Sequence, residues 1–137
     1  MSEVQAIELV ERFPGVDDYM RLRALTGLSP KSEEAARRGL TGTTYGVSLL
    51  RGEEVVGMGR IVGDDGCFHF VVDIAVHPDL QGHGLGKRIM DALDAWLHAN
   101  ALPTAHVSLF ADGKAKELYA KYGFAQSAHS VGMFYRV

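Results

Sequence analysis

The fold is decided by VDIAVHPDLQGHGLGK at residues 72–87. An apolar, β-branched run leads here into a turn with three alternate glycines, and the turn leads into a segment whose apolar residues repeat at helical spacing. Glycine lets the backbone pass close to a ligand, and the unpaired N–H groups of a helix's first turn attract negative charge. The stretch therefore predicts a strand, an anion-binding turn and a helix, with a phosphate-bearing cofactor as the natural ligand.

The sequence before this stretch predicts an antiparallel meander. Residues 44–51 and 55–62 have the alternating pattern of strands, and a hairpin turn separates them. A second turn, GDDG at 63–66, then leads into a third strand over residues 67–77. We expect a strand at residues 4–10 and two short helices before the meander, the second with Ser32 as its N-cap.

After the glycine turn, the apolar stripe predicts a long amphipathic helix that ends near Asn100. A strand at 104–110, a short helix at 113–122 and a last strand at 130–137 follow. A helix between two strands of one sheet implies a right-handed parallel crossover. The predicted fold is α/β (α+β), with a mixed, mostly antiparallel sheet of six to seven strands flanked by about four helices, in a single domain over residues 1–137.

Composition excludes several classes of protein. The net charge is −3, so we expect no nucleic-acid partner, and the single cysteine, Cys67, excludes an intrachain disulfide. The six histidines show no ligand spacing, so no metal is expected. No apolar run is long enough to cross a bilayer, and the N-terminus lacks the features of a signal peptide. We therefore expect no membrane partner and a cytoplasmic location.

The glycine turn does not match the common nucleotide motifs. A dinucleotide fingerprint, G-x-G-x-x-G, would need its third glycine one residue after Gly86. A P-loop would need a glycine at Gln81 and a serine or threonine at Arg88. Both motifs also begin with parallel strand and helix units, whereas a meander precedes this turn. These two classes of nucleotide site are therefore not expected.

The pattern that does fit is Q-x-x-G-x-G, which runs from Gln81 to Gly86. A second motif, LYAKYGF, follows at residues 118–124. Together the two motifs resemble those of the GNAT superfamily of acetyl-CoA-dependent N-acyltransferases, and the resemblance covers residues 45–124. It implies an enzyme that transfers an acetyl group from acetyl-CoA to a primary amine, of a small molecule or exposed on a protein, by direct attack in a ternary complex.

The resemblance also implies a cofactor site. In this family the strand before the glycine turn splays from its parallel neighbour, and its backbone binds the pantetheine arm as an added strand would. The glycine turn then holds the pyrophosphate. Carried over by position, the residues expected to contact acetyl-CoA are Ile74, Ala75, Val76, Gln81, Gly82, His83, Gly84, Leu85, Gly86, Lys87, Lys114 and Tyr119.

Three residues are candidates for the chemistry. By resemblance, the Val76 N–H would polarise the thioester carbonyl, and Tyr119 would protonate or hydrogen-bond the departing sulfur. A general base is needed because an amine with a pKa of about 10 is only about one-thousandth neutral at pH 7. Asp73 is the candidate base, as the only carboxylate in an otherwise apolar strand. A water relay is an equal alternative.

Two further alternatives stay open. A catalytically silent CoA-binding sensor or regulatory module would keep the same cleft. It stays an alternative because the sequence does not identify the general base. The last strand could pair with a second subunit, so a homodimer is a possible assembly. No motif identifies the acceptor amine.

Overall fold

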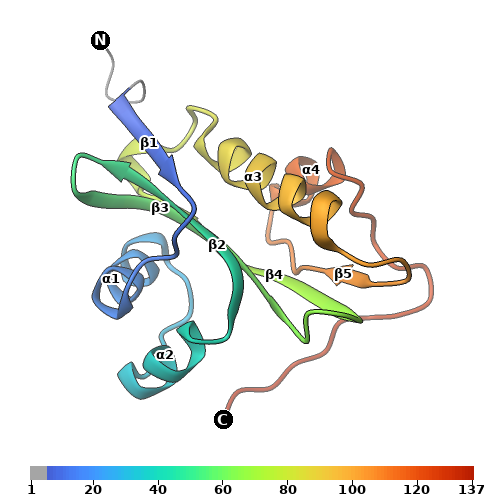
Figure 1. Ribbon diagram of the computed structural model, residues 1–137. Coiled ribbons are helices and arrows are strands. Elements are labelled where there is room, and N and C mark those ends of the chain that lie inside the picture. The colour runs from blue at the N-terminus through green and yellow to red at the C-terminus, as the bar shows by residue number, and fades with distance from the viewer. Residues whose placement is uncertain (1–5) are drawn as a thin grey trace.

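The computed structural model describes residues 6–137 and shows one five-stranded sheet with the strands in chain order (Figure 1). β1 to β4 are antiparallel neighbours, and β5 lies parallel to β4 at the edge. The strands are β1 (Ile7–Val10), β2 (Thr43–Arg51), β3 (Glu54–Gly63), β4 (Phe68–Val76) and β5 (His106–Ser108).

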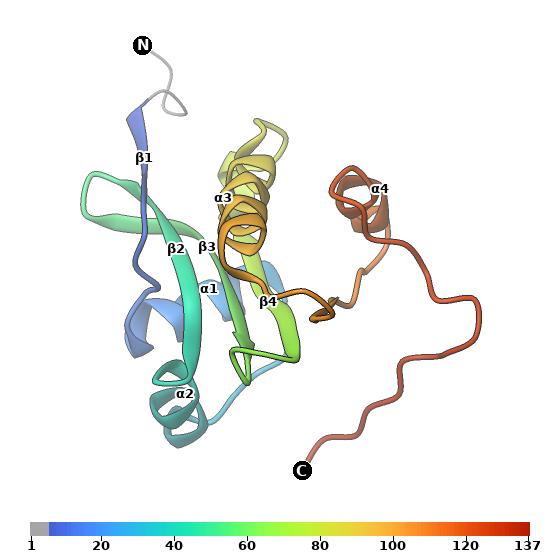
Figure 2. The same cartoon turned by 45° about the vertical axis from the view of Figure 1, so that its right-hand side comes forward.

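Helices cover the two faces of the sheet (Figures 1 and 2). One face carries α1 (Val16–Thr26) and α2 (Glu33–Leu40), and the other carries α3 (Leu85–Asn100) and α4 (Ala115–Ala120). A short 3-10 turn at Pro78–Leu80 leads from β4 toward α3. The sheet therefore separates two apolar clusters, a large one under α3 and a smaller one under α1 and α2.

Local signals in the sequence account for the element boundaries. The Ser32 hydroxyl accepts a hydrogen bond from the Ala35 N–H at 3.0 Å and caps α2. Gly27 ends α1 in the left-handed conformation, with φ at 76°. In the turn between β3 and β4, the Asp64 Oδ1 accepts hydrogen bonds from three successive N–H groups, of residues 66–68.

The large core consists of α3 seated on the middle of the sheet. Ile89, Met90 and Leu93 are fully buried, against Val47 and Val56 of β2 and β3. A fully buried aliphatic side chain contributes about 1.5–3 kcal/mol to folding. The stripe that predicted this helix is therefore the main stabilising face of the molecule.

The predicted meander, the Ser32 cap and the long helix to Asn100 with its parallel crossover are confirmed. The sheet has five strands rather than six to seven. The first strand covers Ile7–Val10, and residues 4 and 5 of its predicted range lie outside the described residues.

The predicted elements after α3 are shorter than expected. The strand at 104–110 reduces to His106–Ser108, and the helix at 113–122 reduces to Ala115–Ala120. The predicted strand at 130–137 is absent, although its residues favour a strand. A strand needs a partner edge, and these residues leave the sheet rather than pair with it (Figure 2).

Candidate active site

A β-bulge divides β4 into two halves. Val72 lies opposite Arg60 and Ala75 lies opposite Met58, so Asp73 and Ile74 together face Gly59 of β3. Asp73 lies in the bulge and has a φ of +60°, which is uncommon for a residue other than glycine. The bulge turns the second half of β4 away from the direction of the first.

The two parallel strands diverge after this point. β5 pairs with β4 only from Phe68 to Phe70, whereas β4 continues to Val76. The His77 N–H donates to the Val56 carbonyl at 2.7 Å, and successive N–H groups in a strand point to opposite edges. The Val76 N–H therefore points away from β3, toward the side where β5 has separated. This gap between β4 and β5 presents backbone groups that an extended ligand can bind.

The glycine turn lies at the end of this gap, where β4 leads into α3. Gly82 and Gly84 have φ of 83° and 79°, and Gly84 is the N-cap of α3. No acidic residue occupies the first turn of α3, so no carboxylate of that turn offsets the positive end of the helix dipole. The Gln81 side chain donates to the Val76 carbonyl at 3.1 Å and ties the turn to the strand.

The predicted anion-binding residues are accessible. The four residues 81–84 are exposed, whereas Leu85 is buried and anchors the helix start in the core. The Lys87 ammonium lies 3.1 Å from Asp91 in an exposed ion pair, which a phosphate can replace at little cost. The turn thus combines open backbone, a helix N-terminus and a movable cation, and these features fit a pyrophosphate.

The short helix α4 packs beside the first turn of α3. The Tyr122 hydroxyl donates to the Asp91 Oδ1 at 2.6 Å and to the Lys87 carbonyl at 3.3 Å. A methyl group placed on Gly86 would lie 3.9 Å from the Leu118 side chain, which shows how near the two helices approach. The helix with the second motif is therefore held against the predicted phosphate site.

Tyr119 lies on this helix with a free hydroxyl. Its ring packs against the core and against Phe124, 6.5 Å between ring centroids, and its hydroxyl makes no hydrogen bond within residues 6–137. Burial, and then the negative charge of Asp112, raise the pKa of Tyr119 above its ordinary value of 10.0. The phenol is therefore protonated at neutral pH and can donate a proton. Lys114 is exposed at the N-cap of α4.

Asp73 lies on the opposite face of the sheet, against α1. Its carboxylate accepts hydrogen bonds from Arg23 Nη1 at 2.6 Å, Arg60 Nε at 2.8 Å and the Tyr19 hydroxyl at 2.9 Å. The side chains of Asp73, Arg23 and Arg60 are about 10%, 6% and 11% exposed. The carboxylate predicted as the base is thus already engaged by three donors. As the base, Asp73 stays a prediction, and its contacts anchor the bulge to α1.

This buried cluster around Asp73 was not expected from the sequence. Tyr19 and Arg23 stand four residues apart on one face of α1, and that spacing was the available signal. Nothing in the local sequence indicates that Arg60, 13 residues before Asp73, completes the cluster across the hairpin. A second unexpected feature is His69, whose two ring nitrogens are buried without a hydrogen-bond partner in the described part of the chain.

The position of α3 on the sheet is fixed next to the bulge. A methyl group on Gly59 would lie 2.5 Å from the Ile89 Cγ2 and 3.4 Å from the Ile74 side chain. Glycine at this position therefore lets α3 sit directly on β3, beside the residues of the bulge.

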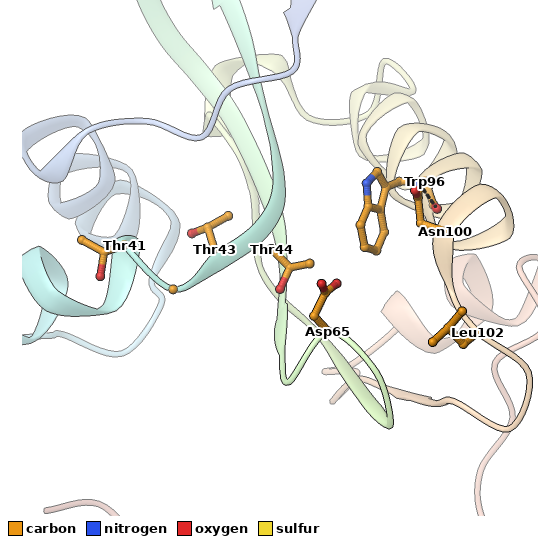
Figure 3. A pocket seen from close by; sticks show the side chains of 8 residues that line it. Thr41, Thr43, Thr44, Asp65, Trp96, Asn100 and Leu102 are labelled. Atoms are coloured by element: carbon orange, nitrogen blue, oxygen red, sulfur yellow. Dashed lines mark hydrogen bonds between the residues drawn. The ribbon is translucent and has the colours of Figure 1, made fainter.

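The structure also has a cavity of about 630 Å³ at the other end of α3 (Figure 3). Thr43, Asp65, Trp96 and Asn100 are among the residues that line it. None of the predicted site residues lies there, because the glycine turn precedes the N-terminus of α3 and this cavity borders its C-terminal end. The cavity is therefore separate from the candidate acyl site.

Two other kinds of site are absent from the described residues. Residues 6–137 contain no group of three or more histidine, cysteine or acidic side chains placed to hold a metal ion. None of the helices in this same range is long and apolar enough to cross a membrane.

Comparison with known proteins agrees with the geometry. The model of the acetyltransferase (GNAT) domain matches residues 44–126, more than half of the chain. A crystal structure of a probable acetyltransferase of unknown function from methicillin-resistant Staphylococcus aureus is 36% identical, with a TM-score of 0.90, over 96% of this chain and 99% of that one. The chain belongs to the GNAT acetyltransferase family.

Two curated relatives are similar over parts of their length. The uncharacterized N-acetyltransferase ycf52 of Porphyra purpurea is 37% identical over 82 residues, which are 59% of this chain and 46% of that protein. The chloroplastic serotonin N-acetyltransferase 2 of Oryza sativa subsp. japonica is 33% identical over 121 residues, 82% of this chain and 58% of that protein. The chain thus spans about half the length of these relatives. Its cytoplasmic location stays a prediction.

Proposed function

We propose that the protein transfers an acetyl group from acetyl-CoA to an amine. The observation that carries the proposal is the gap between β4 and β5, with an exposed glycine turn and the N-terminus of α3 at its end. An extended ligand that ends in phosphate groups fits this arrangement, because backbone groups line the gap and positive charge lies beyond it. Membership of the GNAT family supports acetyl-CoA as that ligand.

The proposed cofactor contacts follow the two halves of this site. Ile74, Ala75 and Val76 would bind the amide-rich arm through their backbone, and the residues from Gln81 to Lys87 would hold the pyrophosphate. Lys114 is exposed at the start of α4, so its ammonium can approach a phosphate. When bound, acetyl-CoA supplies an activated thioester. The residues of the chain would bind and orient acetyl-CoA and the amine, and they would move protons.

The proposed reaction forms a C–N bond between the amine and the acetyl carbon and breaks the C–S bond to CoA. The Val76 N–H would stabilise negative charge on the carbonyl oxygen, which is worth about 10²–10³ in rate for one donor. Tyr119 would give its phenolic proton to the departing sulfur. Its free, protonated hydroxyl supports this role.

The proton lost by the amine needs an acceptor. Asp73 or a water chain would take it, and the three hydrogen bonds that Asp73 accepts favour the water chain, with Asp73 as a positioning residue for the bulge. In this proposal the bulge, which bends β4, would direct the Val76 N–H toward the thioester. A positioning role of Asp73 and direct proton transfer by Asp73 predict different pH profiles of kcat.

The acceptor is proposed to be a primary amine, of a small molecule or exposed on a protein. The name of the rice relative supports a small aromatic amine as one member of the test panel. The experiment is release of free CoA thiol from acetyl-CoA by the purified protein, with a panel of small amines and of peptides with free N-termini or lysines. Turnover that depends on the amine supports the proposal.

A CoA-binding sensor is the second candidate, and the engagement of Asp73 by two arginines is the observation that favours it. Calorimetry with acetyl-CoA separates the two functions. Binding without turnover on any amine would support the sensor, and absence of binding would contradict both.

A further inference from the structure

The cavity at the C-terminal end of α3 joins three parts of the fold (Figure 3). Thr44 comes from the start of β2, Asp65 from the turn between β3 and β4, and Trp96, Asn100 and Leu102 from the end of α3 and the loop after it. The volume of about 630 Å³ lies within the range of small-molecule sites, which is about 300–1,000 Å³. The cavity is therefore large enough for a ligand of its own.

This cavity and the acyl site lie at opposite ends of β4. The strand has nine residues, from Phe68 next to the turn that carries Asp65 to Val76 at the gap. At about 3.3 Å per residue, these ends are about 25 Å apart. A small ligand in the cavity therefore cannot reach the Val76 N–H.

Asp65 gives the cavity its charge. Within residues 6–137 it is the one charged side chain that lines the cavity, and its carboxylate makes no hydrogen bond or ion pair in that range. Its backbone has a φ of +64°, which is uncommon for a residue other than glycine, and the three N–H groups that Asp64 binds fix the turn around it. The fold thus presents an unpaired carboxylate to the cavity, which favours a cation.

The neighbouring polar groups are also hydrogen-bond acceptors. The Thr44 hydroxyl makes no hydrogen bond to any described residue. The Asn100 Nδ2 donates to the Trp96 carbonyl at 2.9 Å, which leaves the amide oxygen of Asn100 to accept. Figure 3 shows Asp65 between Thr44 and the Trp96 ring. A protonated primary amine has three N–H donors, and these acceptors complement them.

The rest of the lining includes apolar surface. Leu102 is 60% exposed, and the Trp96 ring is held in place by two other rings. Tyr45 stacks on Trp96 with 5.5 Å between centroids, and His69 packs edge-to-face at 5.8 Å. A rigid aromatic wall beside a carboxylate fits a ligand that has an apolar group next to its charge.

We propose that this cavity binds a small organic ammonium ion with an aromatic or branched apolar group. The ammonium would pair with the Asp65 carboxylate and donate to Thr44 and Asn100. The apolar group would cover the exposed surface of Trp96 and Leu102. No residue of the acyl site takes part, so this binding does not depend on the proposed acetyl transfer.

The fluorescence of Trp96 tests the proposal, because the sequence has a single tryptophan. The full chain is titrated with benzylamine at pH 7, where the amine is protonated, in the absence of acetyl-CoA. The emission should change in a saturable manner. Benzyl alcohol has the ring without the charge, and methylamine has the charge without the ring, so each should bind at least tenfold more weakly. Equal affinity for benzylamine and either analogue would overturn the proposal.

A substitution at Asp65 locates the ligand. Asp65→Asn keeps the size of the side chain, and asparagine tolerates a positive φ, so folding should be retained and is checked by circular dichroism. Its affinity for benzylamine, measured by fluorescence and by calorimetry, should fall at least tenfold. The matched control is Asp94→Asn, which removes the same charge from α3 outside the lining of the cavity and should change the affinity less than twofold. Binding that Asp65→Asn leaves unchanged, or no saturable binding to the full chain by either method, would contradict the proposal.

Discussion

Arg23 Nη1 lies 2.6 Å from Asp73 Oδ1, and this ion pair joins α1 to the bulge of β4. Both side chains are about nine-tenths buried, and Arg60 approaches the other carboxylate oxygen at 2.8 Å. Removal of one member of a buried ion pair leaves an uncompensated charge, which costs about 3–5 kcal/mol. The bulge that separates β4 from β5 is therefore coupled to the stability of the fold.

Asp73→Asn should lower the free energy of unfolding by about 3 kcal/mol, because two buried guanidinium groups lose their counterion. Denaturant titration measures this loss. The matched control is Asp18→Asn in α1, the helix that carries Arg23, because the ion pair of Asp18 with Arg21 is partly exposed and should contribute less than about 1 kcal/mol.

The pH profile of the same variant separates the two roles of Asp73. If Asp73 positions the bulge, kcat should fall and the shape of the pH profile should be unchanged. Loss of the acidic limb, with a fall of more than about 100-fold in kcat, would instead identify Asp73 as the base. A fall of less than tenfold with an unchanged profile would exclude direct proton transfer.

Tyr119→Phe should reduce kcat by about 10- to 100-fold and leave the unfolding midpoint almost unchanged, because the lost hydroxyl has no hydrogen-bond partner among residues 6–137 and the ring is kept. Tyr122→Phe, in the turn that follows α4, is the control. It removes a 2.6 Å hydrogen bond to Asp91, so it should lower stability by about 1–2 kcal/mol and affect kcat less. Equal kcat for Tyr119→Phe and the unchanged protein would contradict the acid role.

Gly86→Ala should weaken acetyl-CoA binding by tenfold or more without loss of stability. The fold accommodates the methyl group, since its nearest neighbour would be at 3.9 Å and Gly86 has no positive φ, and alanine favours the helix. Only a ligand that lies against the backbone would be obstructed. Gly39→Ala in α2, with open space around it, is the control for binding measured by calorimetry. Unchanged affinity of Gly86→Ala would place the phosphates elsewhere.

His69→Leu should stabilise the protein by about 1 kcal/mol, because both ring nitrogens of His69 are buried with no hydrogen-bond partner among the described residues, and leucine removes this desolvation cost. Thermal unfolding of the two proteins at one pH provides the comparison. The substitution also removes the edge-to-face contact between the His69 and Trp96 rings, whose centroids are 5.8 Å apart, and this loss lowers stability. A destabilised variant would show that packing against Trp96 outweighs the unpaired nitrogens.

Alkaline pH should destabilise the fold through its tyrosines. Burial, followed by the hydrogen bond to Glu11, raises the pKa of Tyr45 to about 12, and burial first also raises the pKa of Tyr19. Since the folded state holds these protons more tightly than the unfolded state, the stabilisation is complete below pH 10 and is lost as the pH rises from 10 to about 12. The unfolding midpoint should therefore fall over this range, and Tyr45→Phe should reduce the fall.

The parts of the fold with strong periodicity were predictable from the sequence. The meander and α3 follow from alternation and from a continuous apolar stripe, and the glycine turn follows from its spacing. The strand at 130–137 was not formed because strand composition alone does not supply a partner edge. Strand propensity describes the conformation that a segment favours. Whether the segment pairs depends on whether the rest of the chain offers it an unpaired strand edge.

The site was predictable to the same extent. The turn and Tyr119 lie in motifs that are local in sequence, and the gap was expected from the family resemblance that these motifs carry. The cluster of Asp73 with Tyr19, Arg23 and Arg60 joins three elements that are up to 54 residues apart, and no local pattern reports such a contact. The bulge itself depends on an extra residue in β4 relative to β3, which is visible only once the register is known.

The absence of a side chain at Gly59 has a consequence for how the protein would select its donor. Because α3 rests on β3 beside the bulge, the span from the glycine turn to the Val76 amide is set by the core and not by a flexible loop. The chain would therefore select donors by the distance between their reactive carbonyl and their phosphates. A donor whose reactive carbonyl and phosphates match this span would engage both ends, and a shorter thioester would reach only one.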